Sequence, residues 1–396
     1  MRRLAPACCI GLLAAVLSAS SLLSQEPQKA TIEAQTVLLV PAESQPGKVT
    51  GRIVTRDQEG GLLLEDSSGV YWTLEAKVIT ARQPAGHAYQ RAEADELAES
   101  LRSAAGGNVL VVKTKHYVIA SRASRAYATW CGALLERLRT GFLGHWERVK
   151  LPLTPNDSPL PILILQNKTQ FTEYAVRDGA AAAAETFGYY SARTNRVVLF
   201  DLTADQPGEP LGEAAGRDEI TRRLSRTPAS VATVVHEAVH QLAFNTGLQV
   251  RYADNPMWLT EGLAMYFETP DFGTGTRWTG AGKTNPWRLQ EFQRSLPMRA
   301  EDSLSTLAQN EDRFHEPATM TSAYAESWVL VHYLSTKRRE QWLEYLKTMR
   351  DKAPLVFETP EERLAAFRKA FGDDLSDLDK AVITHARELG QRRSIP

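Results

Sequence analysis

The feature that most constrains this chain is the pentapeptide HEAVH at residues 236–240, which lies in a run that predicts a helix. From Pro228 to Phe244 the run contains no glycine and no further proline, and its apolar residues recur at helical spacing. Pro228 suits a first helical turn, and Gly247 suits a C-terminal stop. Because residues four apart share one face of a helix, both imidazoles can point at one ion.

Glu237 follows the first histidine and can lean over the same ion as a proton acceptor. On an otherwise apolar helix, two histidines and a glutamate need partners, and a metal ion supplies them. The alternative is a helix whose His and Glu side chains are solvated. The motif therefore predicts a metal site with His236 and His240 as ligands and Glu237 as a base.

A catalytic zinc ion takes three protein ligands and a water, and Glu261 is the candidate third ligand. The segment 255–268 predicts a second helix that runs through Phe267, with Asn255 as its N-cap and Pro256 at its first position. Glu261 has apolar neighbours on this helix, and a turn between the two helices would bring it back against the histidines. Glu268 is the competing carboxylate, and the alternative for Glu261 is an ordinary solvated position.

HEAVH followed by WLTEGLAMYFE at residues 258–268 resembles the gluzincin peptidases of the peptidase MA-like superfamily. More narrowly, the chain resembles uncharacterised exported bacterial proteins that pair His-Glu-x-x-His with Trp-Leu-x-Glu-Gly after a segment like HYVIAS at 116–121. The resemblance covers about 108–346. It implies a zincin-like fold, Zn2+ ligands at His236, His240 and Glu261, and Glu237 as general base. It implies no particular substrate.

One position departs from the resemblance. Thermolysin-like enzymes carry an acidic residue four positions after the glutamate ligand, where it supports a histidine ligand, but Met265 stands there in this chain. The group that orients a histidine ligand must therefore come from elsewhere.

The resemblance also implies a donor for the oxyanion of a tetrahedral intermediate, commonly a tyrosine or histidine beyond the second helix. The candidates are Tyr324, then His315 and His332. Tyr324 opens a strongly helical segment, which would let its phenol reach across a cleft, although a packing role at a helix start is equally consistent. His315 lies in a polar stretch that indicates a solvated side chain, and His332 lies among apolar residues that indicate a core histidine.

Residues 1–24 predict a secretory signal peptide, with Arg2 and Arg3 before a largely apolar stretch. The mature protein is therefore expected to be exported, to the periplasm or beyond the cell, and without a membrane contact. An uncleaved anchor is the alternative. Cys8 and Cys9 would leave with the signal, so Cys131 would remain as a small core residue that has no internal disulfide partner.

The composition bounds the partners. Lys and Arg total 46 against 47 Asp and Glu, and no basic block is interleaved with aromatics, which argues against nucleic acid. The sequence leaves the oligomeric state open. A peptide or protein substrate is the partner that the metal motif and the resemblance imply.

The predicted fold class is α+β. A small all-β module at 31–84 precedes a zincin-like metallopeptidase domain at 105–396, which divides into an α/β lobe (105–225) and a helical lobe (226–396). Its sequence predicts strands at 48–54, 61–65 and 70–74, which are compatible with a partly open barrel. The module is expected to serve either for binding or as a structural cap.

The larger domain carries the remaining predicted elements. By the resemblance, one edge strand of its mixed sheet would pair with an extended peptide. Its expected elements are a polar helix at 88–104, two strands within 108–121, a helix at 125–148, a strand at 161–166, a helix at 169–176, a hairpin of 187–190 with 196–200, and C-terminal helices at 325–346, 360–371 and 374–389.

Three functions fit the sequence. The first is an exported zinc peptidase that uses a zinc-activated water and Glu237 as base. The second is a non-catalytic exported binding protein that retains a structural metal site. Glu237 favours the first, since a structural zinc needs no base and tends to recruit a fourth Cys or His ligand. Hydrolysis of a non-peptide amide or ester would use the same chemistry.

Overall fold

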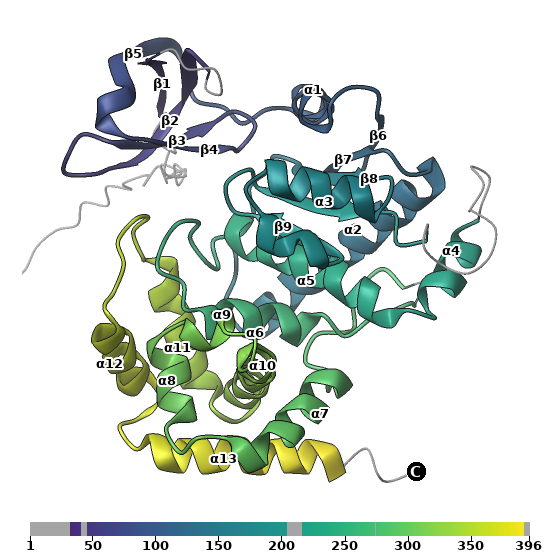
Figure 1. Ribbon diagram of the computed structural model, residues 1–396, viewed down its shortest axis with the longest axis vertical. Coiled ribbons are helices and arrows are strands. Elements are labelled where there is room, and N and C mark those ends of the chain that lie inside the picture. Colours follow the sequence, from purple (N-terminus) through teal and green to yellow (C-terminus); the bar gives the residue numbers. More distant parts are fainter. Residues whose placement is uncertain (1–31, 41–45, 204–215, 274, 392–396) are drawn as a thin grey trace, which may run out of the picture.

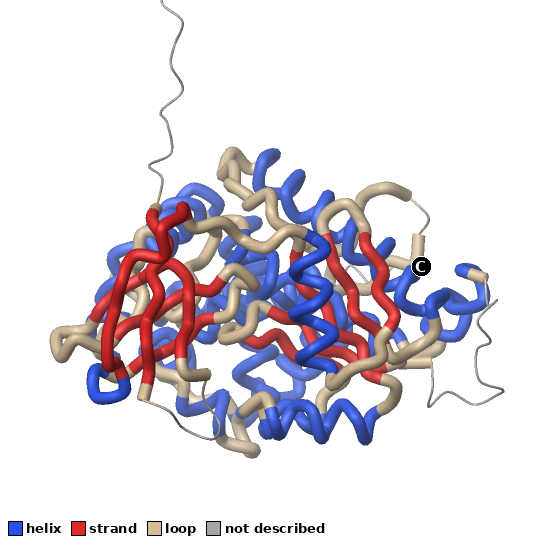
Figure 2. The backbone as a smooth tube through the Cα atoms, turned by 90° about the horizontal axis from the view of Figure 1, so that it is seen from above, coloured by secondary structure: helices blue, strands red, loops and turns tan. Residues whose placement is uncertain are grey.

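The computed structural model describes residues 32–40, 46–203, 216–273 and 275–391, and the predicted signal peptide lies outside these ranges. The architecture is mixed α+β, with an N-terminal all-β sheet, a second sheet covered by helices, and a helical C-terminal half. Figure 2 separates the two groups of strands clearly. No helix in the described ranges combines the length and the apolar character needed to cross a bilayer.

The first sheet forms the β module that the sequence predicts. It has the order β4-β3-β2-β1-β5 and antiparallel neighbours throughout. Its core is small and separate from the main core. Its elements are β1 (Glu33–Leu39), β2 (Lys48–Arg56), β3 (Leu62–Asp66), β4 (Tyr71–Leu74), the 3-10 turn η1 (Ala76–Val78) and β5 (Ile79–Ala88).

Strand β5 carries the module beyond the expected boundary at residue 84, and the helix expected from residue 88 begins only at Ala94. Pro84 and Gly86 indicate a turn in the sequence, yet Pro84 lies opposite Gln35 of β1. Strand β5 is at the edge of the sheet, so no strand pairs with its outer side. Proline, which has no amide hydrogen, is therefore tolerated there without the loss of a hydrogen bond between strands.

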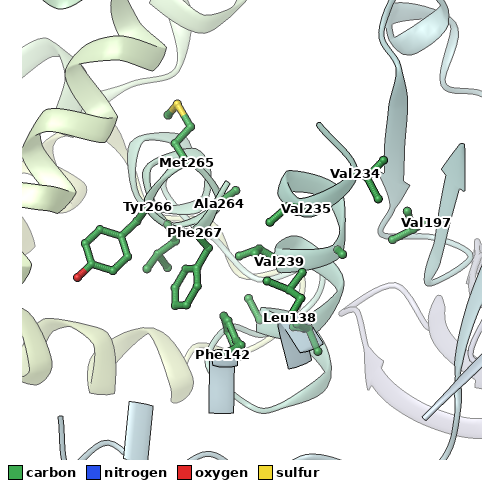
Figure 3. Close-up of a cluster of buried hydrophobic side chains, with 14 of the residues drawn as sticks. Leu138, Phe142, Val197, Val234, Val235, Val239, Ala264, Met265, Tyr266 and Phe267 are labelled. Atoms are coloured by element: carbon green, nitrogen blue, oxygen red, sulfur yellow. The ribbon is translucent and has the colours of Figure 1, made fainter. Parts of the chain in front are cut away.

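The second sheet has the order β6-β7-β8-β10-β9, with β9 at one edge, antiparallel to β10. Ile119 of β7 lies beneath α2, and Val197 of β10 lies beside α5, so α2 and α5 share one face (Figure 3). The elements are α1 (Ala94–Ala105), β6 (Leu110–Lys113), β7 (Tyr117–Ser121), α2 (Arg125–Arg148), β8 (Leu160–Leu165), α3 (Lys168–Arg177), η2 (Ala181–Glu185), β9 (Gly188–Ser191), β10 (Arg196–Phe200) and α4 (Arg217–Leu224).

The C-terminal half is helical, as predicted, but it is more divided. The helix expected at 325–346 is two helices, because the backbone breaks at Arg338, and the first begins before Tyr324. The elements are α5 (Pro228–Asn245), α6 (Met257–Phe267), α7 (Pro286–Ser295), η3 (Leu296–Met298), α8 (Ser303–Gln309), α9 (Asp312–His315), α10 (Met320–Lys337), α11 (Arg339–Arg350), α12 (Pro360–Phe371) and α13 (Leu375–Gln391).

Helix α5 is held on two sides by apolar contacts. Figure 3 shows Val239 facing Leu138 of α2 and Phe267 of α6, while Val234 faces Val197 of β10. All five side chains are at most 1% exposed. Each such burial stabilises the fold by about 1.5–3 kcal/mol, so the helix that carries HEAVH has a fixed position relative to the sheet and to α6.

The structure confirms that Cys131 is a small core residue, as expected. It is a free cysteine, fully buried within α2. Burial raises the pKa of its thiol, so it packs as a small apolar residue.

Candidate metal centre and active-site cleft

Three predicted site residues converge at the contact between α5 and α6. His236 and His240 come from α5 and Glu261 from α6, and one ligand atom from each lies within 4.8 Å of the other two. Nε2 of His236 is 2.9 Å from Oε2 of Glu261, and Nε2 of His240 is 3.6 Å from Oε1 of Glu261. Both histidines are 8% exposed. This cluster could hold a metal ion, and its two imidazoles and one carboxylate match the donor set of catalytic zinc.

The protonation of the two histidines differs. Burial lowers the pKa of His240 to about 4, so this imidazole is neutral near pH 7, as a ligand must be. Burial would also lower the pKa of His236, but hydrogen bonds with Glu261 and Glu268 outweigh it and raise that pKa well above its usual value. A metal ion at the cluster would therefore replace the hydrogen bond between Nε2 of His236 and Glu261, because a ligating nitrogen carries no proton.

Glu268 supplies the group that orients His236, a role that Met265 cannot fill. Its Oε2 is 2.8 Å from Nδ1 of His236, and its Oε1 accepts hydrogen bonds from Asn285 Nδ2 at 2.7 Å and Arg288 Nε at 3.3 Å. A carboxylate on the second nitrogen of a metal-binding histidine fixes the tautomer and the ring orientation. Met265 is buried and points away from α5 (Figure 3).

The spacing of the two glutamates is a sequence signal for this role. Glu268 lies seven positions after Glu261, which is two helical turns and therefore the same face of α6. The role of competing ligand does not suit it, since its carboxylate is engaged with Nδ1 of His236, Asn285 and Arg288. Burial alone would raise the pKa of Glu268, but the His236 hydrogen bond and the Arg288 charge lower it to about 2, so this group remains an acceptor.

Glu237 lies beside the cluster, with its carboxylate against the edge strand β9. Its Oε2 accepts a hydrogen bond from the backbone N–H of Tyr190 at 2.8 Å. Burial raises the pKa of Glu237 to about 7, close to the value that suits a base working near neutral pH. A divalent cation in the cluster would lower that pKa, because its charge favours the carboxylate.

The packing of β9 against β10, beside Glu237, depends on Gly188. A Cβ at this position would lie 2.5 Å from the Leu199 side chain and 3.8 Å from Cγ of Glu237. No residue type in the sequence marks Tyr190 as a site residue, because its backbone rather than its side chain makes the contact.

The cluster opens into a cleft of about 760 Å³ that is lined by residues of β9 and the segment before it and of α5, α6, α7 and α10. Tyr324, at the start of α10, lines this cleft together with Glu237 and the three cluster residues. Gly262 allows α10 to approach α6, because a Cβ there would lie 2.5 Å from Val331 and 2.7 Å from the carbonyl of Ser327. Burial raises the pKa of Tyr324, so its phenol keeps the proton that a hydrogen-bond donor needs.

The two histidine candidates lie elsewhere. His315 is exposed and is absent from the cleft wall. His332 is buried, with its Nδ1 2.9 Å from Nε2 of His385 and its Nε2 3.2 Å from the carbonyl oxygen of Gly282. Of the three candidate donors, Tyr324 alone borders the cleft.

Residues 230–356 of the chain match a family described as "Protein of unknown function (DUF1570)". The matched span contains His236, Glu237, His240, Glu261 and Tyr324. A comparison with curated proteins returned no match. The family description names no activity, so a function for this chain has to be argued from the geometry of the cleft.

Proposed function

We propose that the protein is an exported zinc-dependent peptidase of the gluzincin type, with a zincin-like catalytic domain and its active site in the cleft. One observation carries the proposal. Two histidines and a glutamate converge on one point, and a second glutamate lies beside them on the wall of an open cleft. A site built only to hold a structural metal would have no use for Glu237 and would be closed by a fourth ligand.

A bound zinc ion supplies a Lewis acid that polarises a carbonyl group and lowers the pKa of a water molecule. Glu237 accepts a proton from the attacking water as the water oxygen bonds to the carbonyl carbon of the substrate. When the carbon–nitrogen bond breaks, Glu237 passes that proton to the leaving amine. Tyr324 donates a hydrogen bond to the oxygen on which negative charge develops. Glu268 keeps His236 in its ligating orientation.

Strand β9 offers a place for an extended peptide. Among the described residues β10 is its one strand neighbour, and no strand is hydrogen-bonded to the opposite edge. The Tyr190 N–H on that outer edge already reaches Glu237. A peptide added along β9 by main-chain hydrogen bonds would run past the base, which is the arrangement that peptide hydrolysis requires.

The cleft also indicates which side chains a substrate carries. Phe187 from the sheet lobe and Trp287 and Met320 from the helical lobe line it, and they are 44%, 42% and 41% exposed. Large apolar side chains exposed together around one cleft mark a binding surface. We therefore expect cleavage next to large apolar residues.

The test is a cleavage profile against a mixed peptide library, run with and without a zinc chelator. The proposal expects cleavage next to large apolar residues, complete loss with chelator, and recovery when zinc is restored. A zinc-loaded, folded protein that cleaves no peptide would contradict the peptidase function and favour the binding-protein alternative.

Replacing Tyr324 by phenylalanine removes the proposed oxyanion donor without changing the ring. We expect kcat to fall by about a hundredfold with little change in KM, because the lost hydrogen bond acts chiefly in the transition state. Tyr333→Phe is the matched control, since Tyr333 lies on the same helix but not on the cleft wall. Equal kinetics in the two variants would remove Tyr324 from the mechanism.

A further inference from the structure

A buried ionic cluster joins the β module to the domain that carries the cleft. At its centre is Glu65 of β3, which is 0% exposed. Its carboxylate accepts hydrogen bonds from Arg52 Nε at 2.6 Å, from Arg251 Nη2 at 2.9 Å and from Arg91. A buried charge of this kind is tolerated only when it is paired and fully hydrogen-bonded, so the three arginines have fixed positions around it.

Arg251 connects three separate parts of the chain. It lies in the loop between α5 and α6, the two helices that carry the metal cluster, and it is 4% exposed. Its Nη1 donates to the carbonyl of Gly69 in the β module at 2.9 Å and to the carbonyl of Ala192 in the β9–β10 turn at 3.1 Å. Its guanidinium carbon lies 3.6 Å from the centre of the Tyr71 ring.

The β9–β10 turn receives further contacts from both sides. The backbone N–H of Tyr71, at the start of β4, donates to the carbonyl of Arg193 at 2.7 Å. Asn195 exchanges side-chain hydrogen bonds of 2.7 and 3.0 Å with Asn245, the last residue of α5. The turn of the hairpin is thus held between the β module and the C-terminal end of the helix that carries HEAVH.

Tyr190 links the hairpin turn to Glu237. Its hydroxyl donates to Oδ1 of Asn195 at 2.9 Å, and its backbone N–H donates to Glu237 at 2.8 Å. Its ring stacks on Phe244 of α5 with centroids 5.7 Å apart. Since β9 is an edge strand, these contacts and its pairing with β10 set its distance from Glu237.

We infer that the β module is a positioning element of the active site, which acts through Glu65 and Arg251 on the β9–β10 hairpin. This resolves the choice between a separate binding module and a structural cap in favour of a part that sets the place of the substrate-binding strand. The kinetic consequence rests on the proposed function. The placement of the hairpin does not, and it can be measured independently.

Two conservative variants separate positioning from general stability. Arg251→Lys keeps the positive charge but lacks the fork that reaches Glu65, Gly69 and Ala192 together. Arg52→Lys likewise keeps a cation beside Glu65, but Arg52 lies within β2, and among the described residues its side-chain hydrogen bond is to Glu65 and not to the hairpin. Hydrogen exchange of the peptide covering β9 and β10 is compared in the full-length protein. The inference expects faster exchange in Arg251→Lys than in the wild type, and unchanged exchange in Arg52→Lys.

The same variants are then assayed with a long peptide that can pair along β9 and with a short one that cannot. A small displacement of a positioning strand can lower kcat/KM by about ten- to hundredfold, so Arg251→Lys should lose that much on the long peptide, and much less on the short one, with bound zinc unchanged. Arg52→Lys should stay within about twofold of the wild type on both.

The outcomes of the two readouts are distinguishable. If both variants exchange and react alike, the β module has only a general structural role and the inference is overturned. If neither preparation nor the wild type cleaves peptides, but the hairpin still loosens only in Arg251→Lys, the inference stands and the proposed function is the part that fails.

Discussion

Glu237→Gln is expected to lose peptide hydrolysis almost completely while it still binds zinc. Glutamine has the shape of glutamate, and its amide oxygen can still accept the Tyr190 N–H, but it cannot take a proton from water. Loss of a general base lowers the rate by about a hundred- to ten-thousandfold. The measurement is kcat on the best peptide of the library, together with the zinc content of the same preparation.

An exposed glutamate provides the control. Glu99 is exposed on α1 and is not among the residues that line the cleft, so Glu99→Gln should match the wild type in both measurements. Turnover in Glu237→Gln comparable with that of this control would show that Glu237 is not the base, and it would leave the metal cluster without its proposed chemistry.

Glu261→Ala is expected to have the largest effect on metal binding, because it removes one of three ligand groups. Glu268→Ala should weaken binding less, by about ten- to hundredfold, since Glu268 orients His236 through its Nδ1 without belonging to the cluster itself. Zinc affinity is measured by competition with a chromophoric chelator. Both variants remove a largely shielded carboxylate from α6 or its end, so each serves as the control for the other.

The order of these two effects decides the assignment of the third ligand. A larger loss of zinc affinity in Glu268→Ala than in Glu261→Ala would exchange the roles of the two carboxylates. Equal and slight losses would mean that neither group is a ligand.

The two helices of the metal cluster could be predicted because several local signals agree there. Helix α5 has proline in its first turn, unbroken apolar spacing, and Gly247 after its end with a φ of 73°. Helix α6 ends at Phe267, as expected, and begins one residue later than expected, at Met257. Residues four apart on one such helix share a face, so the HEAVH motif alone is enough to predict that His236 and His240 belong to one site.

The groups around the cluster were harder to predict because they depend on distant contacts. Tyr190 acts through its backbone N–H, which any residue in that place would supply, so no residue type marks the position. Helix α7 is short and has only two buried residues, yet Asn285 caps it and also binds Glu268. Arg251 connects segments that are far apart in the sequence, and only the folded chain brings them together.

Elemental analysis tests the proposed metal centre most directly. The purified mature protein is first brought to equilibrium by dialysis against dilute zinc. The geometry of His236, His240 and Glu261 predicts about one zinc ion per chain, retained by the wild type and lost when both histidines are replaced by alanine. A folded wild-type protein that retains no zinc, or that retains as much as the double alanine variant, would contradict it.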